Sequence, residues 1–152
     1  MSSPAPPAPS TPPAYWQIGV LVQDLEGAME EMSRSLHLTW TDIKVYGTTE
    51  QPMRVVMSQE GPPYFELVEG PPGSAWDCSD GPKLDHLAYW TPDIAQERAR
   101  LEEAGAPVVM DGEARGKLVN YHALPTAGFR IEVFDASRRD EIRSDWDFED
   151  VG

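Results

Sequence analysis

Four polar side chains stand out because each lies inside a short segment of otherwise apolar, strand-forming residues. They are Gln17, Glu66, His86 and Glu132. A carboxylate buried among apolar residues is strongly unfavourable unless it is ion-paired or bound to a metal. One imidazole nitrogen with three oxygen donors forms a fairly hard site, which suits zinc, nickel, cobalt, manganese or magnesium better than copper(I) or an iron–sulfur cluster. The alternative is that Arg54 and Arg130 each neutralise one glutamate and that the histidine is an ordinary core residue.

The segments that must position these side chains alternate between strand and helix patterns. The first half predicts a strand over 15–22, a helix from Asp24 to about Leu36, and strands over 39–46, 52–58 and 64–69. A loop rich in glycine and proline follows. The second half predicts a strand over 84–90, a helix from Asp93 to about Ala104, and strands near 107–110, 117–123 and 129–134. The order of one strand, one helix and three strands therefore occurs twice.

The two halves also match residue by residue, as expected of a duplicated module. Adding 69 to the residue number pairs a strand residue, a helix cap and two core positions with their equivalents: Gln17 with His86, Asp24 with Asp93, Leu25 with Ile94 and Met32 with Leu101. The two glutamates are 66 apart, which implies a net three-residue shortening in the second copy. The predicted organisation is a disordered proline-rich leader over 1–14, a first βαβββ module over 15–69, a linker over 70–83, a second module over 84–136 and an acidic tail over 137–152.

Strand alternation predicts which face of the sheet each candidate residue occupies. In the last strand the apolar residues alternate with Glu132, which therefore points away from the helix. The same alternation places Glu66 and Gln17 on this enclosed face and Trp16 on the opposite, helix-covered face. The repeat assigns His86 to the enclosed face. The four candidate ligands are thus expected to share one side of the sheet.

Composition narrows the class of partner. The 152 residues include 26 acidic and 12 basic ones, for a formal charge of -14. Nucleic acids and anionic membranes need positive charge at the contact, so a small-molecule substrate is the better prediction. The sequence lacks a signal-peptide pattern and a run of roughly 20 apolar residues, so we expect a cytoplasmic protein. The charged tail favours disorder, and the alternative is that Trp146 and Phe148 dock on a partner subunit or cover a pocket.

Residues 15 to 136 resemble the vicinal oxygen chelate superfamily, which includes glyoxalase I, methylmalonyl-CoA epimerase, extradiol dioxygenases, and fosfomycin- and bleomycin-resistance proteins. The resemblance lies in QIGVLVQDLEGAM, FELVEG, HLAYWTPDIAQERARLEEAG and GFRIEVFD. It implies an α+β, glyoxalase-like fold in which the two modules pair into a cupped, incomplete β-barrel. It also implies that metal ligands come from the first and fourth strands of each module, and the residues at those positions resemble the ligand set of some glyoxalase I enzymes: Gln17, Glu66, His86 and Glu132.

This ligand set also discriminates among the chemistries of the superfamily. Extradiol dioxygenases and fosfomycin-resistance proteins use two histidines and one carboxylate, whereas here His86 is the single histidine of the set. The resemblance therefore favours an isomerase or lyase in which a divalent ion polarises a carbonyl or enediolate and a glutamate transfers a proton at the adjacent carbon. Glu132, and secondarily Glu66, are the candidate catalytic residues. The alternative is a non-enzymatic protein of the same fold that binds a drug or metabolite.

The remaining expectations concern the substrate. Six further side chains are candidate substrate-binding residues: Trp40, Arg54, Tyr64, Trp90, Tyr121 and His122. The turn before the last strand is LPTAG, which departs from the Asp-Pro-x-Gly of relatives, and the chain shows no basic cluster assignable to glutathione carboxylates or CoA phosphates. We therefore expect a less charged carbonyl compound as substrate and, from the resemblance, a homodimer.

Overall fold

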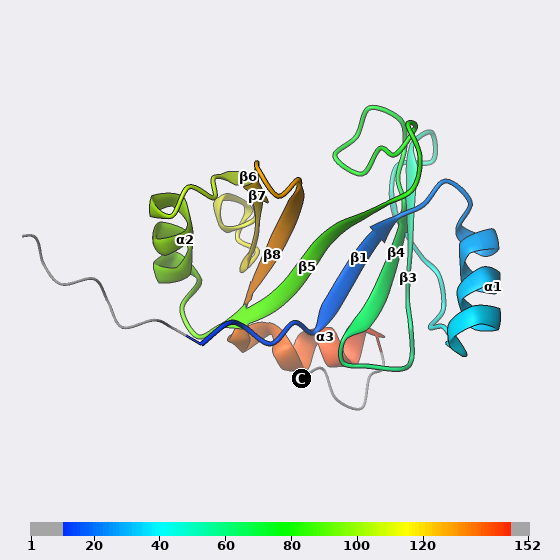
Figure 1. Ribbon diagram of the computed structural model, residues 1–152, viewed down its shortest axis with the longest axis horizontal. Coiled ribbons are helices and arrows are strands. Elements are labelled where there is room, and N and C mark those ends of the chain that lie inside the picture. The colour runs from blue at the N-terminus through cyan, green and yellow to red at the C-terminus, as the bar shows by residue number, and fades with distance from the viewer. Residues whose placement is uncertain (1–10, 147–152) are drawn as a thin grey trace, which may run out of the picture.

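Residues 11–146 are described by the computed structural model, and they form one eight-stranded mixed sheet with three α-helices (Figure 1). The first module comprises β1 (Gln17–Leu21), α1 (Leu25–Leu36), β2 (Lys44–Gly47), β3 (Pro52–Met57) and β4 (Tyr64–Glu69). The second comprises β5 (Lys83–Thr91), α2 (Ile94–Glu103), β6 (Val108–Asp111), the 3-10 helix η1 (Glu113–Arg115), β7 (Val119–Leu124) and β8 (Phe129–Asp135). The 3-10 helix η2 (Ala136–Arg138) and α3 (Arg139–Trp146) follow. The predicted pair of βαβββ modules is confirmed.

Helices α1 and α2 begin at the two aspartates that the repeat predicted as caps. The carboxylate of Asp24 accepts a hydrogen bond from the Gly27 amide at 3.0 Å, and that of Asp93 accepts one from the Gln96 amide at 3.0 Å. Each cap satisfies a backbone donor that the helix itself cannot pair, a contribution of about 1 kcal/mol. Each cap lies 7 residues after the predicted first-strand ligand of its module, Gln17 or His86.

The strand order is β2-β3-β4-β1-β5-β8-β7-β6. The first strands of the two modules, β1 and β5, pair antiparallel at the centre, while β1 pairs parallel with β4 and β5 pairs parallel with β8. In each parallel pair the glutamate lies beside the residue two positions after the predicted first-strand ligand: Glu66 beside Gly19, and Glu132 beside Ala88. The tertiary register therefore preserves the repeat found in the sequence.

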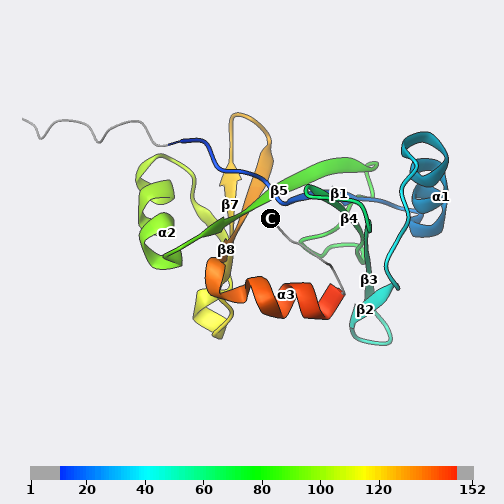
Figure 2. The same ribbon diagram turned by 90° about the horizontal axis from the view of Figure 1, so that it is seen from below.

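The helices occupy both faces of the sheet. Helix α1 packs on the first module through a cluster that includes Leu25 and Leu67, and α2 packs on the second through one that includes Leu101 and Val133. Figure 1 shows these two helices at opposite ends of the sheet, and Figure 2 shows α3 crossing below it from the β7 and β8 side towards β3. The opposite, concave face carries the candidate ligands, and α3 packs on part of this face through Ile142 and Trp146.

Helix α3 corrects the expectation of disorder for its part of the acidic tail. Ile142 is buried in a cluster with Met57 and Phe134, and Trp146 packs against the same cluster. Ile142 and Trp146 are four residues apart and share one face of the helix, so an otherwise polar segment still buries an apolar stripe. Phe148 lies outside the described residues.

Trp16 corrects the predicted facing of the first strand. Its side chain belongs to the concave-face cluster with Met57 and Tyr64, rather than to the cluster under α1. The residue precedes β1, so the alternation of the strand does not extend to it. The strand predicted over 39–46 is also shorter, because β2 begins at Lys44.

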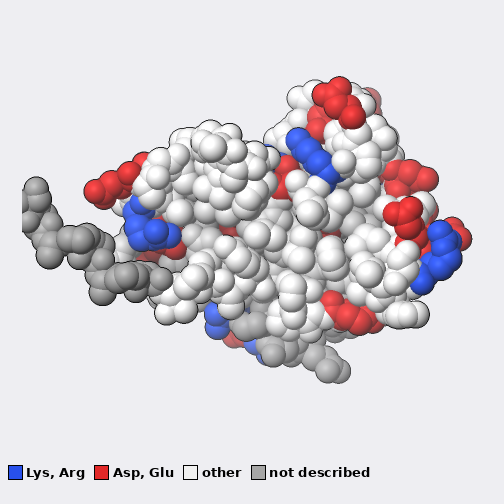
Figure 3. Space-filling view, viewed as in Figure 1, with Lys and Arg blue, Asp and Glu red and all other residues white. Residues whose placement is uncertain are grey.

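The surface and termini add two observations. On the face shown in Figure 3, acidic and basic side chains lie mainly at the margins, and other residues occupy most of the centre. No helix among residues 11–146 is long and apolar enough to cross a membrane. Most of the leader predicted over 1–14 lies outside the described residues.

Candidate metal centre

Three side chains from three strands meet on the concave face. Nε2 of His86 on β5 lies 3.3 Å from Oε1 of Glu66 on β4 and 3.3 Å from Oε1 of Glu132 on β8. The donor atoms of these residues all lie within 4.8 Å of one another. Zinc–nitrogen and zinc–oxygen bonds are about 2.0–2.2 Å long, so two ligands of one ion stand up to about 4 Å apart. Glu66, His86 and Glu132 can therefore hold one metal ion after small side-chain adjustments.

At this centre, one atom of His86 and one atom of Glu132 lack a hydrogen-bond partner in the described part of the chain. Within residues 11–146, His86 Nε2 and Glu132 Oε1 are buried without a hydrogen bond, although they lie 3.3 Å apart. Buried polar atoms are normally paired, and an unpaired one costs about 1–3 kcal/mol. A divalent cation between the carboxylates and the imidazole would satisfy both atoms, so the residues present fit such an ion.

Gln17 is buried on the same face, but its role as a fourth ligand stays a prediction. Its Nε2 donates a hydrogen bond to Sδ of Met57 at 3.6 Å, and its Oε1 is buried without a partner among the described residues. Along the sheet, Gln17 pairs with Ala88, whereas the residue opposite His86 is Gly19. Gln17 therefore lies two residues along β1 from the position opposite His86.

Gly19 provides the space for the histidine ring. A Cβ atom built on Gly19 would lie 2.0 Å from Cε1 and 2.2 Å from Nε2 of His86. The imidazole thus lies directly over the backbone of β1, and a side chain on Gly19 would occupy the same space. This role of Gly19 was not predicted from the sequence, although a glycine within a strand is the signal of such a close approach.

Asp85 is a second residue whose role was not predicted from the sequence. The β1–β5 register shifts between Gly19 and Val20, which face His86 and Leu84 respectively, so Asp85 is an extra residue in β5. This irregularity brings Asp85 to the same side as its neighbour, with Oδ2 2.8 Å from His86 Nδ1. Regular alternation predicts opposite faces for adjacent residues, and a bulge is what breaks that rule.

Aromatic side chains form the wall around the histidine. The Tyr121 ring centroid lies 5.2 Å from that of His86, and the Trp76 ring lies 6.1 Å from it. Trp76 comes from the segment predicted as a linker, and the guanidinium of Arg130 lies 4.8 Å from its ring centroid. The linker thus also helps to close the site.

The electrostatics of the centre favour bound protons in the absence of a cation. Burial opposes a charged imidazole, but the carboxylates of Asp85, Glu132 and Glu66 outweigh burial and hold the pKa of His86 well above its ordinary value. Burial also raises the pKa of Glu132, although the neighbouring histidine opposes that shift. A metal ion must displace these protons, so its binding is coupled to pH.

Three of the predicted substrate-binding residues lie on the concave face. Tyr121 is part of the wall described above. Tyr64 is buried in the apolar cluster beneath α3, and Trp90 packs against that cluster with its ring stacked on Trp16 at 4.7 Å. Tyr121 is therefore next to the metal centre, whereas Tyr64 and Trp90 belong to the apolar packing under α3.

Trp40 and Arg54 lie elsewhere, contrary to the prediction. Trp40 packs with the cluster under α1, and its Nε1 donates a hydrogen bond to the Met29 carbonyl at 3.1 Å. Arg54 forms ion pairs with Glu69, at 3.1 Å, and with Glu26. Arg54 therefore has the surface ion-pair role that its residue type would suggest without any substrate.

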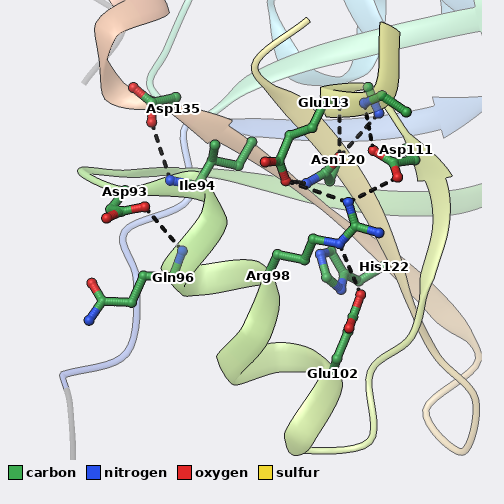
Figure 4. Close-up of polar contacts among 12 residues, drawn as sticks. Asp93, Ile94, Gln96, Arg98, Glu102, Asp111, Glu113, Asn120, His122 and Asp135 are labelled. Atoms are coloured by element: carbon green, nitrogen blue, oxygen red, sulfur yellow. Dashed lines mark hydrogen bonds and ion pairs between the residues drawn. The ribbon is translucent and has the colours of Figure 1, made fainter. Parts of the chain in front are cut away.

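His122 also lies away from the centre, because it follows Tyr121 on β7 and so faces α2. The ring is fully buried, and its Nδ1 lies 2.8 Å from the Ala106 carbonyl oxygen. Figure 4 shows it near Arg98, which bonds Asp111 at 2.9 Å. His122 thus belongs to the packing between α2 and the sheet, not to the substrate pocket.

The fold agrees with comparisons to known proteins. Residues 16–122 match the glyoxalase/bleomycin resistance protein/dioxygenase superfamily. The chain belongs to this superfamily. No protein of curated function matches the sequence significantly.

Similar solved structures include methylmalonyl-CoA epimerase from Mycobacterium tuberculosis, with 18% identity, a TM-score of 0.61, and coverage of 80% of this chain and 87% of that chain. A variant of the Streptomyces coelicolor epimerase in complex with 2-nitronate-propionyl-CoA has 16% identity, a TM-score of 0.60, and coverage of 82% and 98%. A variant of 4-hydroxymandelate synthase from the same organism has 16% identity, a TM-score of 0.60, and coverage of 81% and 48%. At these identities the likeness shows the fold, and it does not specifically favour glyoxalase I.

Proposed function

We propose that this protein is a divalent-metal-dependent isomerase or lyase that transfers a proton at the carbon next to a carbonyl group of a small substrate. The observation that carries the proposal is the convergence of Glu66, His86 and Glu132, in which His86 Nε2 and Glu132 Oε1 are buried without a hydrogen-bond partner among the described residues. A bound divalent ion would supply a Lewis acid for the substrate oxygen.

Glu132 is the proposed base. Its burial raises its pKa, which makes the carboxylate a better proton acceptor and brings it closer to the range in which a general base is most effective. A hydrogen bond from the Tyr121 hydroxyl opposes part of this rise in the pKa of Glu132. Glu66 approaches the histidine from β4, on the other side of the β1–β5 pair, so two carboxylates flank the space for the reacting carbon.

The surroundings support a small and weakly charged substrate. Arg130 is already engaged by Asp85 at 2.6 Å and by the Ala75 carbonyl at 3.2 Å, which leaves it poorly placed to bind a carboxylate or phosphate of a substrate. The rings of Trp76 and Tyr121 beside His86 offer apolar surface instead. This composition suits a carbonyl compound with aromatic or aliphatic substituents.

The test is elemental analysis joined to solvent exchange. The purified protein, Glu66→Gln and Glu132→Gln are loaded with zinc, nickel, cobalt, manganese or magnesium and desalted, with Glu97→Gln as a control because Glu97 is a partly buried glutamate on α2. We expect metal in the parent and control and its loss in both site variants. Metal-loaded parent should exchange the α-proton of small carbonyl compounds for deuterium, followed by NMR. Absence of metal uptake in the parent under every condition contradicts the proposal.

A second candidate function is non-enzymatic binding of a small molecule, favoured by the rings of Trp76 and Tyr121 beside His86. The same experiment separates the two functions. If aromatic carbonyl compounds quench the tryptophan fluorescence of the protein but their α-protons are never exchanged for deuterium, the protein binds these compounds without catalysis.

A further inference from the structure

We propose that Asp85 is a positioning residue of the metal centre: its carboxylate accepts the Nδ1 proton of His86 and thereby presents Nε2 to Glu66 and Glu132. A histidine offers either ring nitrogen to a metal, and the hydrogen bond made by the other nitrogen decides which one. This inference rests on the proposed metal-dependent function.

The contact is built by the backbone of β5. Asp85 is the extra residue at the point where the β1–β5 register shifts, and Oδ2 lies 2.8 Å from His86 Nδ1. The Asp85 residue is 5% exposed and His86 is 2% exposed, so water competes little for either group. A carboxylate in this position costs desolvation energy, which implies that the fold provides compensation for it.

Arg130 provides that compensation. Its Nη2 lies 2.6 Å from Oδ2 of Asp85, and it also donates to the Ala75 carbonyl at 3.2 Å. The guanidinium packs over the Trp76 ring, so it is held from several sides. Arg130 therefore fixes the Asp85 carboxylate, and the carboxylate in turn fixes the imidazole.

The ring has little other freedom. Gly19 lies directly below it, and Tyr121 and Trp76 approach it edge-on. With Nδ1 committed to Asp85, Nε2 is the nitrogen that lies 3.3 Å from both glutamates. The chain Arg130, Asp85, His86 thus orients one ligand in the manner of the carboxylate–histidine–metal arrangements common in metalloproteins.

The alternative is that Asp85 serves only as the ion-pair partner of Arg130. A role in positioning the His86 ring and a role only in the ion pair with Arg130 predict different metal affinities for Asp85→Asn and Asp85→Ala. In Asp85→Asn the amide oxygen can still accept the Nδ1 proton, whereas Asp85→Ala removes the acceptor. If Asp85 positions the ring, asparagine should therefore restore much of the metal affinity, although it weakens the ion pair as alanine does.

The experiment measures zinc affinity by competition with a chelator for the full-length parent, Asp85→Ala, Asp85→Asn and the exposed control Asp80→Asn. Circular dichroism confirms that each variant is folded. We expect Kd to rise about 10- to 100-fold in Asp85→Ala, by a smaller factor in Asp85→Asn, and not at all in the control. Equal losses in the two Asp85 variants, or none, would overturn the proposal.

Nitrogen-15 NMR of the histidine side chains shows which ring nitrogen carries the proton and which binds zinc, and a change in stability alone does not alter this assignment. In the zinc-loaded parent, His86 should carry its proton on Nδ1 and zinc on Nε2, and Asp85→Ala should show mixed coordination. Zinc on Nδ1 in the parent would refute the inference. If the parent binds no zinc, the proposed function fails, and the inference is then judged on the metal-free protein. There, a slowly exchanging Nδ1 proton that disappears in Asp85→Ala supports it, and one that persists overturns it.

Discussion

Gly19→Ala tests whether the position of the His86 ring depends on an empty space in β1. The added Cβ would lie 2.0 Å, 2.2 Å and 2.4 Å from three atoms of the ring. Ordinary non-bonded contacts are about 3.5–4.0 Å, so the ring must move by roughly 1.5 Å. Trp76 and Tyr121 already pack against it, which leaves no easy direction for that movement.

A displacement of this size should disrupt the metal centre more than the fold. Overpacking of a buried site costs about 1–3 kcal/mol of stability. Disturbing the orientation of a metal ligand costs about 10- to 100-fold in metal affinity, so we expect the zinc affinity of Gly19→Ala to fall by a factor in that range. The assays are urea unfolding of the metal-free protein and chelator competition for zinc.

Gly116→Ala is the matched control for this substitution. Gly116 has a φ of 73° and an added Cβ meets nothing within 4 Å, so alanine there introduces backbone strain of about 1–2 kcal/mol without touching the site. We expect a similar loss of stability with unchanged zinc affinity. If folded Gly19→Ala binds zinc within twofold of the parent, His86 does not occupy the position described and the reasoning is refuted.

Three further predictions follow from charge and burial. The pKa of His86 is raised in the folded, metal-free protein, so the contribution of its protonated form to stability is complete below the ordinary pKa of 6.5 and is lost as pH rises through the raised value. Over that pH range the urea midpoint of the metal-free protein should fall and the zinc affinity should rise. A zinc affinity that does not change with pH would contradict the raised pKa. Arg54→Met should change the unfolding free energy by no more than about 1 kcal/mol and leave zinc affinity unchanged, because Arg54 pairs with Glu69 away from the centre. A reduced zinc affinity of this variant in the chelator competition would show that Arg54 belongs to the site. Trp146→Ala should speed zinc uptake in stopped-flow measurements, because α3 packs on part of the concave face, and an unchanged rate would show that zinc enters by another route.

Sequence alone determined the duplicated architecture and the three residues that meet at the centre. Both depend on features that repeat along the chain: the period of apolar residues, the aspartate caps Asp24 and Asp93, and the constant offset that relates Gln17 to His86. Because each module buries one face of its own strands, local alternation was sufficient to place Glu66 and Glu132 on the same side. A buried polar residue in an apolar strand is a signal that does not require knowledge of its partners.

Only the tertiary structure decided how these residues are supported. The bulge that turns Asp85 beside His86, and the approach of that ring to Gly19, arise from pairing between strands more than sixty residues apart in sequence. Helix α3 was hidden because its composition is mostly charged, and the apolar surface that stabilises it belongs to both modules. The positions of aromatic residues could not be predicted for the same reason. Trp40 and Trp90 both lie among strand-forming residues, and only the packing of elements distant in sequence places Trp40 under α1 and stacks Trp90 on Trp16 on the concave face.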